Sequence, residues 1–303
     1  MFINGKFLLL WLASIFAGLS ISIYILVEQW YVVKTLDLKA SLGVVMMATT
    51  IPRVLLMAVG GVLADRLKRS NIIFVSFLIR GLLTGCMAFF VFINQLDLWI
   101  LLIFALLFGA LDALFWPARD SILPLIVKRE QLTRANSFMQ TTKQLSVILG
   151  PVLGSILLST ISYKGVFTTI AILLVLGSLI IAKIKEQQSK KEKTFSFWQE
   201  LKDGIVYVRR STLLSTIMLI FIVVNFLFIG PLMMGIPLIV DEKIHGSALD
   251  LSYLQSSFAG GMLLGALAIG TLNPQKKRGM IAILVIGIEG FILGLLSQVN
   301  ETW

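Results

Sequence analysis

Long runs of apolar residues recur along this chain, and they constrain its fold more than any other feature. A helix needs roughly 20 such residues to cross the hydrocarbon core of a bilayer. Hydrophobic residues make up 57% of the 303 residues and charged residues only 14%, whereas soluble domains carry about 25% charged residues. We therefore predict an all-α protein that crosses a membrane repeatedly. The nine predicted spans are residues 7–33, 42–64, 71–93, 98–117, 137–160, 164–183, 212–239, 251–272 and 280–298.

Lysine and arginine are shared unequally between the connections on the two sides of these spans. If the N-terminus lies in the cytoplasm, the outer connections hold only Lys34, Lys39, Lys164 and Lys243 of the 26 basic residues. The positive-inside rule and anionic lipid both favour this orientation. We therefore predict a multi-pass protein of the plasma membrane with a cytoplasmic N-terminus. The same placement accounts for the net charge of +10, so no nucleic-acid partner is predicted.

The residues that metal and nucleotide chemistry require are scarce in this sequence. His245 is the only histidine and Cys86 the only cysteine, which excludes two-histidine metal motifs and an intrachain disulfide. A phosphate-binding loop of the form G-x-x-x-x-G-K-[ST] is also missing from the sequence. We therefore predict no enzyme activity, no cofactor and no metal. Transport energy is expected from an ion gradient, most simply of protons.

An internal repeat relates the two halves of the sequence. Residues 61–69, GVLADRLKR, align without a gap with residues 270–278, GTLNPQKKR, and the same register places Arg80 on Glu289. Two parallel halves of six helices form a known transporter design. The register implies three further helices beyond residue 303, so we expect nine of twelve helices and a C-terminally incomplete protein. The predicted domains are a six-helix bundle at 1–183, a cytoplasmic linker at 184–211 and a partial three-helix bundle at 212–303.

The connection after the second span carries a recognisable motif. It resembles the sequence G-x-L-A-D-R-x-G-R-[KR] that follows the second helix in the major facilitator superfamily, although Lys68 and Ser70 depart from it. The matching residues are Gly61, Leu63, Ala64, Asp65, Arg66 and Arg69. The resemblance implies a two-bundle fold and a cytoplasmic latch that breaks and re-forms during alternating access. We assign this latch to Gly61, Asp65, Arg66, Arg69 and Arg119.

Physical arguments add two expectations about this latch. Gly61 is expected to let two helices approach closely near the membrane edge. Asp65 is expected to face the positive N-terminus of the next helix and nearby arginine side chains. The alternative is a basic loop that only sets membrane topology.

Two further stretches carry the resemblance. Residues 146–155, SVILGPVLGS, resemble the antiporter motif G-x-x-x-G-P-x-x-G-G at Gly150, Pro151 and Gly154, which implies export and a tight, bent helix pair. Residues 115–138 and 195–210 resemble the macrolide-efflux and enterobactin-exporter branch. The apolar residues of the last stretch share one helical face, which predicts an amphipathic helix on the inner membrane surface rather than an ordinary charged linker. They are Phe197, Leu201, Ile205 and Val208.

Charged residues inside predicted spans are functional candidates because lipid makes them costly. Arg80 and Asp112 lie at similar depths, so we expect them to pair, either as a fixed bridge or within a proton relay. Glu28 shares a helical face with Tyr24, which is compatible with a ligand cavity and equally with an interfacial aromatic belt. Lys143 is expected to extend to the membrane surface. The proton-site candidates are Glu28, Arg53, Arg80, Asp112 and Glu289.

One departure from the family concerns proton coupling. Many drug exporters carry an arginine in the fourth helix, four residues before a glycine. Here Ala105 stands at that distance from Gly109, and either Arg53 or Arg80 is a possible substitute.

The sequence as a whole predicts a monomeric secondary transporter. We expect proton-coupled efflux of amphipathic small molecules such as drugs, macrolides or siderophores. The alternatives are a facilitator-type importer and a truncated membrane protein that transports nothing.

Overall fold

The chain folds almost entirely into helices. The structure is a computed structural model, and it describes residues 4–184, 186, 197–272 and 278–296. Helical segments account for most of these residues, and no strand occurs among them. The α-helices are α1 (Gly5–Trp30), α2 (Leu42–Arg66), α3 (Arg69–Phe92), α4 (Leu98–Ile126), α5 (Leu132–Ala182), α6 (Phe197–Arg210), α7 (Thr212–Val224), α8 (Gly230–Glu242), α9 (Ala248–Leu272) and α10 (Arg278–Leu296).

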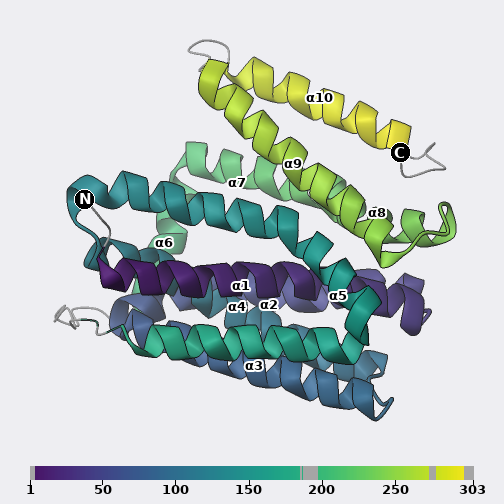
Figure 1. The fold of residues 1–303 in the computed structure, drawn as a ribbon. Coiled ribbons are helices and arrows are strands. Elements are labelled where there is room, and N and C mark those ends of the chain that lie inside the picture. The colour runs from purple at the N-terminus through teal and green to yellow at the C-terminus, as the bar shows by residue number, and fades with distance from the viewer. Residues whose placement is uncertain (1–3, 185, 187–196, 273–277, 297–303) are drawn as a thin grey trace.

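Two membrane-length segments are composite. The π-helix Tyr31–Thr35 continues α1, and the π-helix Asn225–Ile229 joins α7 to α8. Helix α5 combines two predicted spans, and the chain reverses at Ser162, whose φ is 60° and ψ 173°. Figure 1 shows this reversal as the sharp bend in the teal ribbon. Within the described residues, six helical segments are long and apolar enough to cross a membrane.

Most predicted spans agree with the helices, and one ends too early. The span predicted at 98–117 continues as α4 to Ile126, although Pro117 and Pro124 lie inside it. Membrane helices tolerate proline because neighbouring groups satisfy the freed backbone. Arg119 therefore lies within a helix and not in a loop. The last two predicted spans overlap α9 and α10, and the last two residues of the span predicted at 280–298 lie outside the described part of the chain.

The core lies among the first five helices. Helix α1 packs against the first half of α5, α2 packs against α4, and α3 packs against α4 and the second half of α5. Aromatic side chains fill the centre; Tyr24, Phe77, Phe115 and Phe167 are nearly or completely buried. Helix α9 contacts α5 and so connects the first half of the chain to the second. The division into bundles at 1–183 and 212–303 stays a prediction.

The predicted amphipathic segment is helical in the structure. It forms α6, which contacts α2 and α7. Lys202, Arg209 and Arg210 are exposed, Val208 is half-buried and Ile205 is exposed. The side chains of Phe197 and Leu201 lie outside the described part of the chain. An exposed apolar side chain beside exposed charges is compatible with a helix at a membrane surface, whose position there stays a prediction.

Candidate transport site

A buried ion pair lies between α3 and α4. Arg80 Nη1 lies 3.0 Å from Asp112 Oδ1, and the exposed fractions of the two side chains are 0% and 4%. The Arg80 guanidinium also lies over the rings of Phe77, Phe108 and Phe115, at 5.0 to 5.5 Å from their centroids. Pairing and aromatic contact compensate for the loss of water around the charge. The expected contact between Arg80 and Asp112 is therefore present.

The second oxygen of Asp112 has partners that the sequence did not reveal. Asp112 Oδ2 accepts a hydrogen bond from Trp116 Nε1 at 3.1 Å. Arg53 Nη1 on α2 lies 3.5 Å from the same oxygen, and the Arg53 side chain is 36% exposed. One carboxylate thus contacts two arginines from different helices. Asp112 and Trp116 are four residues apart on α4, so their spacing in the sequence already indicates that they share one face of this helix.

Lys143 contacts an aromatic side chain that the sequence did not indicate, and its extension to the membrane surface stays a prediction. Its Nζ lies 4.5 Å from the centroid of the Trp116 ring. Arg119 approaches the same indole, with Cζ at 5.4 Å from the ring centroid. A cation over an indole face is electrostatically favourable, so Trp116 stabilises the ammonium group of Lys143.

Glu28 lies inside the first half of the molecule. The Tyr24 hydroxyl donates to Glu28 Oε1 at 2.7 Å, and both side chains are buried. The Tyr24 ring stacks on Phe108 with centroids 4.3 Å apart. An exposed aromatic belt and an open cavity wall are both wrong descriptions of these two residues. Because Phe108 also contacts Arg80, the Glu28 cluster and the Arg80 cluster share one aromatic ring.

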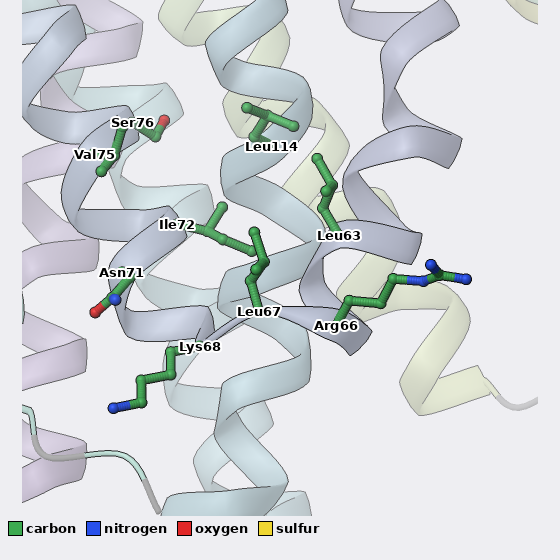
Figure 2. Close-up of a pocket in the computed structure, with 9 residues that line it drawn as sticks. All are labelled: Leu63, Arg66, Leu67, Lys68, Asn71, Ile72, Val75, Ser76 and Leu114. Carbon is green, nitrogen blue, oxygen red and sulfur yellow. The ribbon is translucent and has the colours of Figure 1, made fainter. Parts of the chain in front are cut away.

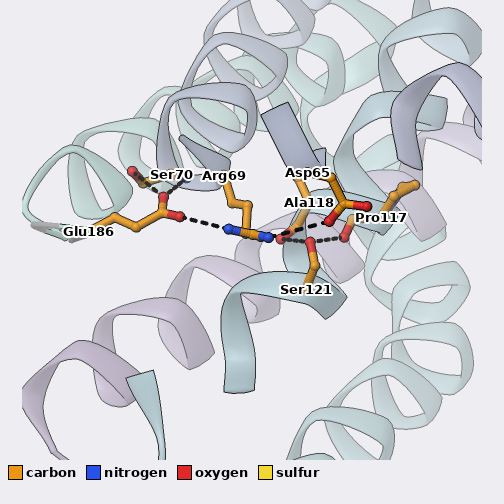
Figure 3. A network of polar contacts seen from close by, with 7 residues as sticks. All are labelled: Asp65, Arg69, Ser70, Pro117, Ala118, Ser121 and Glu186. Carbon is orange, nitrogen blue, oxygen red and sulfur yellow. Dashed lines mark hydrogen bonds and ion pairs between the residues drawn. The ribbon is translucent and has the colours of Figure 1, made fainter. Parts of the chain in front are cut away.

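The predicted latch contains a contact network around Arg69. Arg69 Nη2 lies 3.4 Å from Asp65 Oδ1, and Arg69 Nη1 lies 3.3 Å from Glu186 Oε1 (Figure 3). The backbone N–H and the hydroxyl of Ser70 donate to Glu186 Oε2 at 2.9 and 3.1 Å. Glu186 was missed by the sequence argument, although an acid just past the sixth span suits the N-terminus of α3.

One expectation about the latch is wrong, and the part assigned to Arg119 stays a prediction. A Cβ added at Gly61 would meet nothing within 4 Å, whereas one at Gly60 would collide with the Ala113 backbone of α4. The close helix approach therefore occurs at Gly60. Arg119 contacts Asp120 at 2.8 Å and the Met139 carbonyl at 3.3 Å, and the structure does not bring it to Asp65.

A hollow of about 440 Å³ lies beside the latch loop, between α2, α3 and α4 (Figure 2). Apolar side chains form most of its wall, while Arg66 and Lys68 lie at its edge. Its lining residues are Leu63, Arg66, Leu67, Lys68, Asn71, Ile72, Val75, Ser76 and Leu114. The predicted latch loop thus borders an open, largely apolar surface.

The antiporter-like stretch packs tightly against α1. A side chain at Gly150 would collide with Ser22, and one at Gly154 would crowd Ile23 at 3.3 Å. Ser146 faces Gly18 in the same way. Ser155, which replaces a family glycine, exchanges a hydrogen bond with Ser252 on α9, with the two hydroxyl oxygens 3.0 Å apart. The small residues thus allow the predicted close helix pair, and one departure from the motif contacts the second half.

Further hydrogen bonds extend the contact between α5 and α9. Ser256 donates to the Ile148 carbonyl at 2.7 Å, and the Gln144 amide donates to the Ala259 carbonyl at 3.1 Å. Gln255 donates to Gln29 on α1 at 2.8 Å. We call this set of contacts, including Ser155 and Ser252, the α5–α9 seam.

Ion pairs join the two halves at one end of this seam. Asp241 on α8 lies 3.0 Å from Lys34 Nζ and 2.7 Å from Lys39 Nζ. Lys39 also contacts Glu242 at 3.3 Å. These residues lie on the side that the lysine distribution predicts to face outward. The sequence indicated the lysines but not their partners.

Some predicted features lie outside what the structure describes. Nothing is assigned to the side chain of Glu289, because it lies outside the described side chains. Within the described residues, no group of three or more His, Cys, Asp or Glu side chains is placed to hold a metal ion.

Comparisons with known proteins agree on one family. A family model described as Major Facilitator Superfamily matches residues 10–303. Macrolide efflux protein A of Streptococcus pyogenes is 27% identical, over 78% of this chain and 60% of that protein. Macrolide efflux protein A of Enterococcus faecalis is also 27% identical, over 78% of this chain and 75% of its own length. Multidrug efflux pump Tap of Mycobacterium bovis is 25% identical, over 97% of this chain and 72% of its own length.

Proposed function

Because the chain belongs to the major facilitator superfamily, we propose that it serves the proton-coupled export of amphipathic small molecules across the plasma membrane. Drugs, macrolides and siderophores are examples of such substrates. The names of its relatives, which are efflux proteins, support export over import. The tight packing of α1 on Gly150 and Gly154 supports it too, since the antiporter-like motif supplies both glycines.

The observation that carries the proposal is the one-sided contact between the two halves. The α5–α9 seam and the Asp241 ion pairs hold them together from the middle of α5 to the side predicted to face outward. Towards the opposite end of α9, Leu264 is exposed. A transporter that alternates between two open states needs contacts that close one side at a time. Opening the seam would expose the side predicted to face outward.

Buried charges supply candidates for proton coupling. Glu28 and the group formed by Arg53, Arg80 and Asp112 are charged side chains within the predicted spans of the first half. A carboxylate that changes protonation alters the charge balance of its helix contacts, which is how protons drive such transitions. We assign Glu28 to proton binding and the Arg80–Asp112 pair to structural support.

We further propose that this chain supplies nine of twelve helices. It spans 60% of the length of one macrolide efflux relative, and the internal repeat predicts three helices beyond residue 303. The proposed working unit is a monomer with a cytoplasmic N-terminus.

The decisive experiment measures efflux of a fluorescent amphipathic dye from energised cells. One strain expresses residues 1–303, and a second expresses the chain extended by a three-helix tail from a relative. We expect efflux from the extended form, its loss when a protonophore collapses the proton gradient, and weak or no efflux from residues 1–303. Dye accumulation above that of control cells would favour import instead. Equal efflux from the two forms would contradict the role of the added helices.

A further inference from the structure

Positive charge is in excess near the centre of the first half. Arg53, Arg80 and Lys143 come from α2, α3 and α5, and Asp112 is the one carboxylate that contacts any of them within the described residues. Glu28, a buried carboxylate of α1, is bonded to Tyr24, and Asp120 of α4 is paired with Arg119. A cation without a balancing charge is costly in the membrane and by default marks a functional site. Arg80 is neutralised by Asp112, so the excess falls on Arg53 and Lys143.

These two cations lie around one aromatic side chain. The Lys143 ammonium lies over the Trp116 ring, at 4.5 Å from its centroid. Arg53 Nη1 and Trp116 Nε1 contact the same oxygen of Asp112, at 3.5 and 3.1 Å. Arg53 thus lies near the Nε1 edge of the indole while Lys143 covers its face.

Arg53 and Lys143 are open to a ligand, whereas Arg80 is not. The Arg53 side chain is 36% exposed and Lys143 is exposed. Trp116 is half-buried, and Lys143 and Arg119 both approach its ring. Arg80 is completely buried. A molecule arriving at this surface therefore meets two positive groups and an indole.

A polar hollow lies on α5 towards the inner end predicted for this helix. Its volume is about 540 Å³, and its lining consists of hydroxyl and amide side chains from Thr133, Asn136, Ser137, Gln140 and Thr141. Asn136, Gln140 and Lys143 are spaced by four and three residues, so they share one helix face. Uncharged hydrogen-bonding groups thus lead along α5 to the cationic group at Trp116.

We propose that Arg53 and Lys143 bind the anionic group of an amphipathic organic acid whose planar part lies against Trp116. The inference rests on the proposed transport function and narrows its substrate class to carboxylates and sulfonates with an aromatic portion. Arginine suits such a group because its guanidinium donates two parallel hydrogen bonds to a carboxylate. A cationic drug would meet like charges from two helices, which disfavours its binding.

The test compares two xanthene dyes of opposite charge at neutral pH. Fluorescein is an anion and tetramethylrosamine a cation. Because both contain a xanthene ring, the two dyes are similar in shape and differ mainly in charge. Each dye is titrated against the purified 303-residue chain in a neutral detergent, and fluorescence anisotropy reports binding. We expect the chain to bind fluorescein more tightly than tetramethylrosamine. Arg53→Gln and Lys143→Gln should each weaken fluorescein binding about tenfold, because each removes one charged partner.

Lys128→Gln is the matched control, because it removes an exposed positive charge beyond the end of α4. It should leave binding of both dyes unchanged. Lys143 is exposed, so its variant tests the site even where Arg53→Gln lowers the yield of folded protein. Equal binding of fluorescein by the parent and the Lys143→Gln chain would overturn the proposal, as would no fluorescein binding by the parent.

Efflux assays separate this inference from the proposed function. Export of tetramethylrosamine by the extended chain, with no fluorescein binding, would leave the exporter intact and refute the anion site. Charge-selective fluorescein binding without efflux of either dye would support the anion site and count against export.

Discussion

At the scale of single residues, Asp112 determines how the intramembrane charges of α2, α3 and α4 are balanced. Its two oxygens contact Arg80 and Arg53, so Asp112→Asn leaves both arginines without their carboxylate. Arg80→Gln leaves Asp112 with Arg53. Removing one partner of a buried pair costs about 3 kcal/mol. We therefore expect Asp112→Asn to lower thermal stability more than Arg80→Gln does, measured as folded protein that survives heating and elutes as a monodisperse peak.

The double variant distinguishes contact from independent effects. Arg80→Gln with Asp112→Asn should be more stable than the sum of the single losses predicts, because no fully buried charge is left unpaired. Arg209→Gln, at an exposed position of α6, serves as the control. Strictly additive losses would show that the two side chains do not interact.

At the scale of helices, the two acids that contact Arg69 should behave differently. The Asp65 side chain is 60% exposed, whereas that of Glu186 is 3% exposed. Exposed ion pairs contribute about 0 to 1 kcal/mol to stability. Asp65→Asn should therefore leave folded yield unchanged while slowing export by the extended chain, since it removes a charge that the latch uses in one state only. Export at the parental rate would refute the latch.

Arg69→Gln gives the contrasting result. It unpairs the buried carboxylate of Glu186, so it should reduce the yield of folded protein. A normal yield would show that the Glu186 contact at the start of α3 is dispensable for folding.

The outer ends of α5 and α9 should separate when the charge of Lys39 is reversed. Lys39→Glu places a third negative charge beside Asp241 and Glu242, which now bind its ammonium at 2.7 and 3.3 Å. We expect faster labelling of Ser155→Cys by a membrane-impermeant thiol reagent, with Cys86→Ser removing the native thiol. Lys164→Glu is the control. Lys164 is also a predicted outer-side lysine, but it lies over the ring of Phe92, so its reversal should not change labelling. Unchanged labelling in the Lys39 variant would show that these ion pairs do not close the seam.

At the scale of the whole molecule, the positions of the membrane helices could be predicted from the sequence. The contacts that depend on the direction in which each side chain leaves its helix could not. The apolar runs located the helices because each must match the bilayer. The similar depths of Arg80 and Asp112 in their helices also allowed their contact to be predicted. The contacts of Arg53 with Asp112 and of Lys143 with Trp116 were not predictable, because a helix position changes its direction by about 100° per residue. The same rotation explains why Gly60, and not its neighbour Gly61, contacts α4.

The reversal at Ser162 has a mechanical consequence for the whole first half. A single residue with left-handed φ connects the two parts of α5, so the connection has almost no slack. The first part forms the seam with α9, while the second packs on α3 beside Gly81. We therefore expect a tilt of the first part to be passed on to α3, which carries Arg80 and begins at Arg69. Separation of the two halves at the seam should then displace the charged groups of α3.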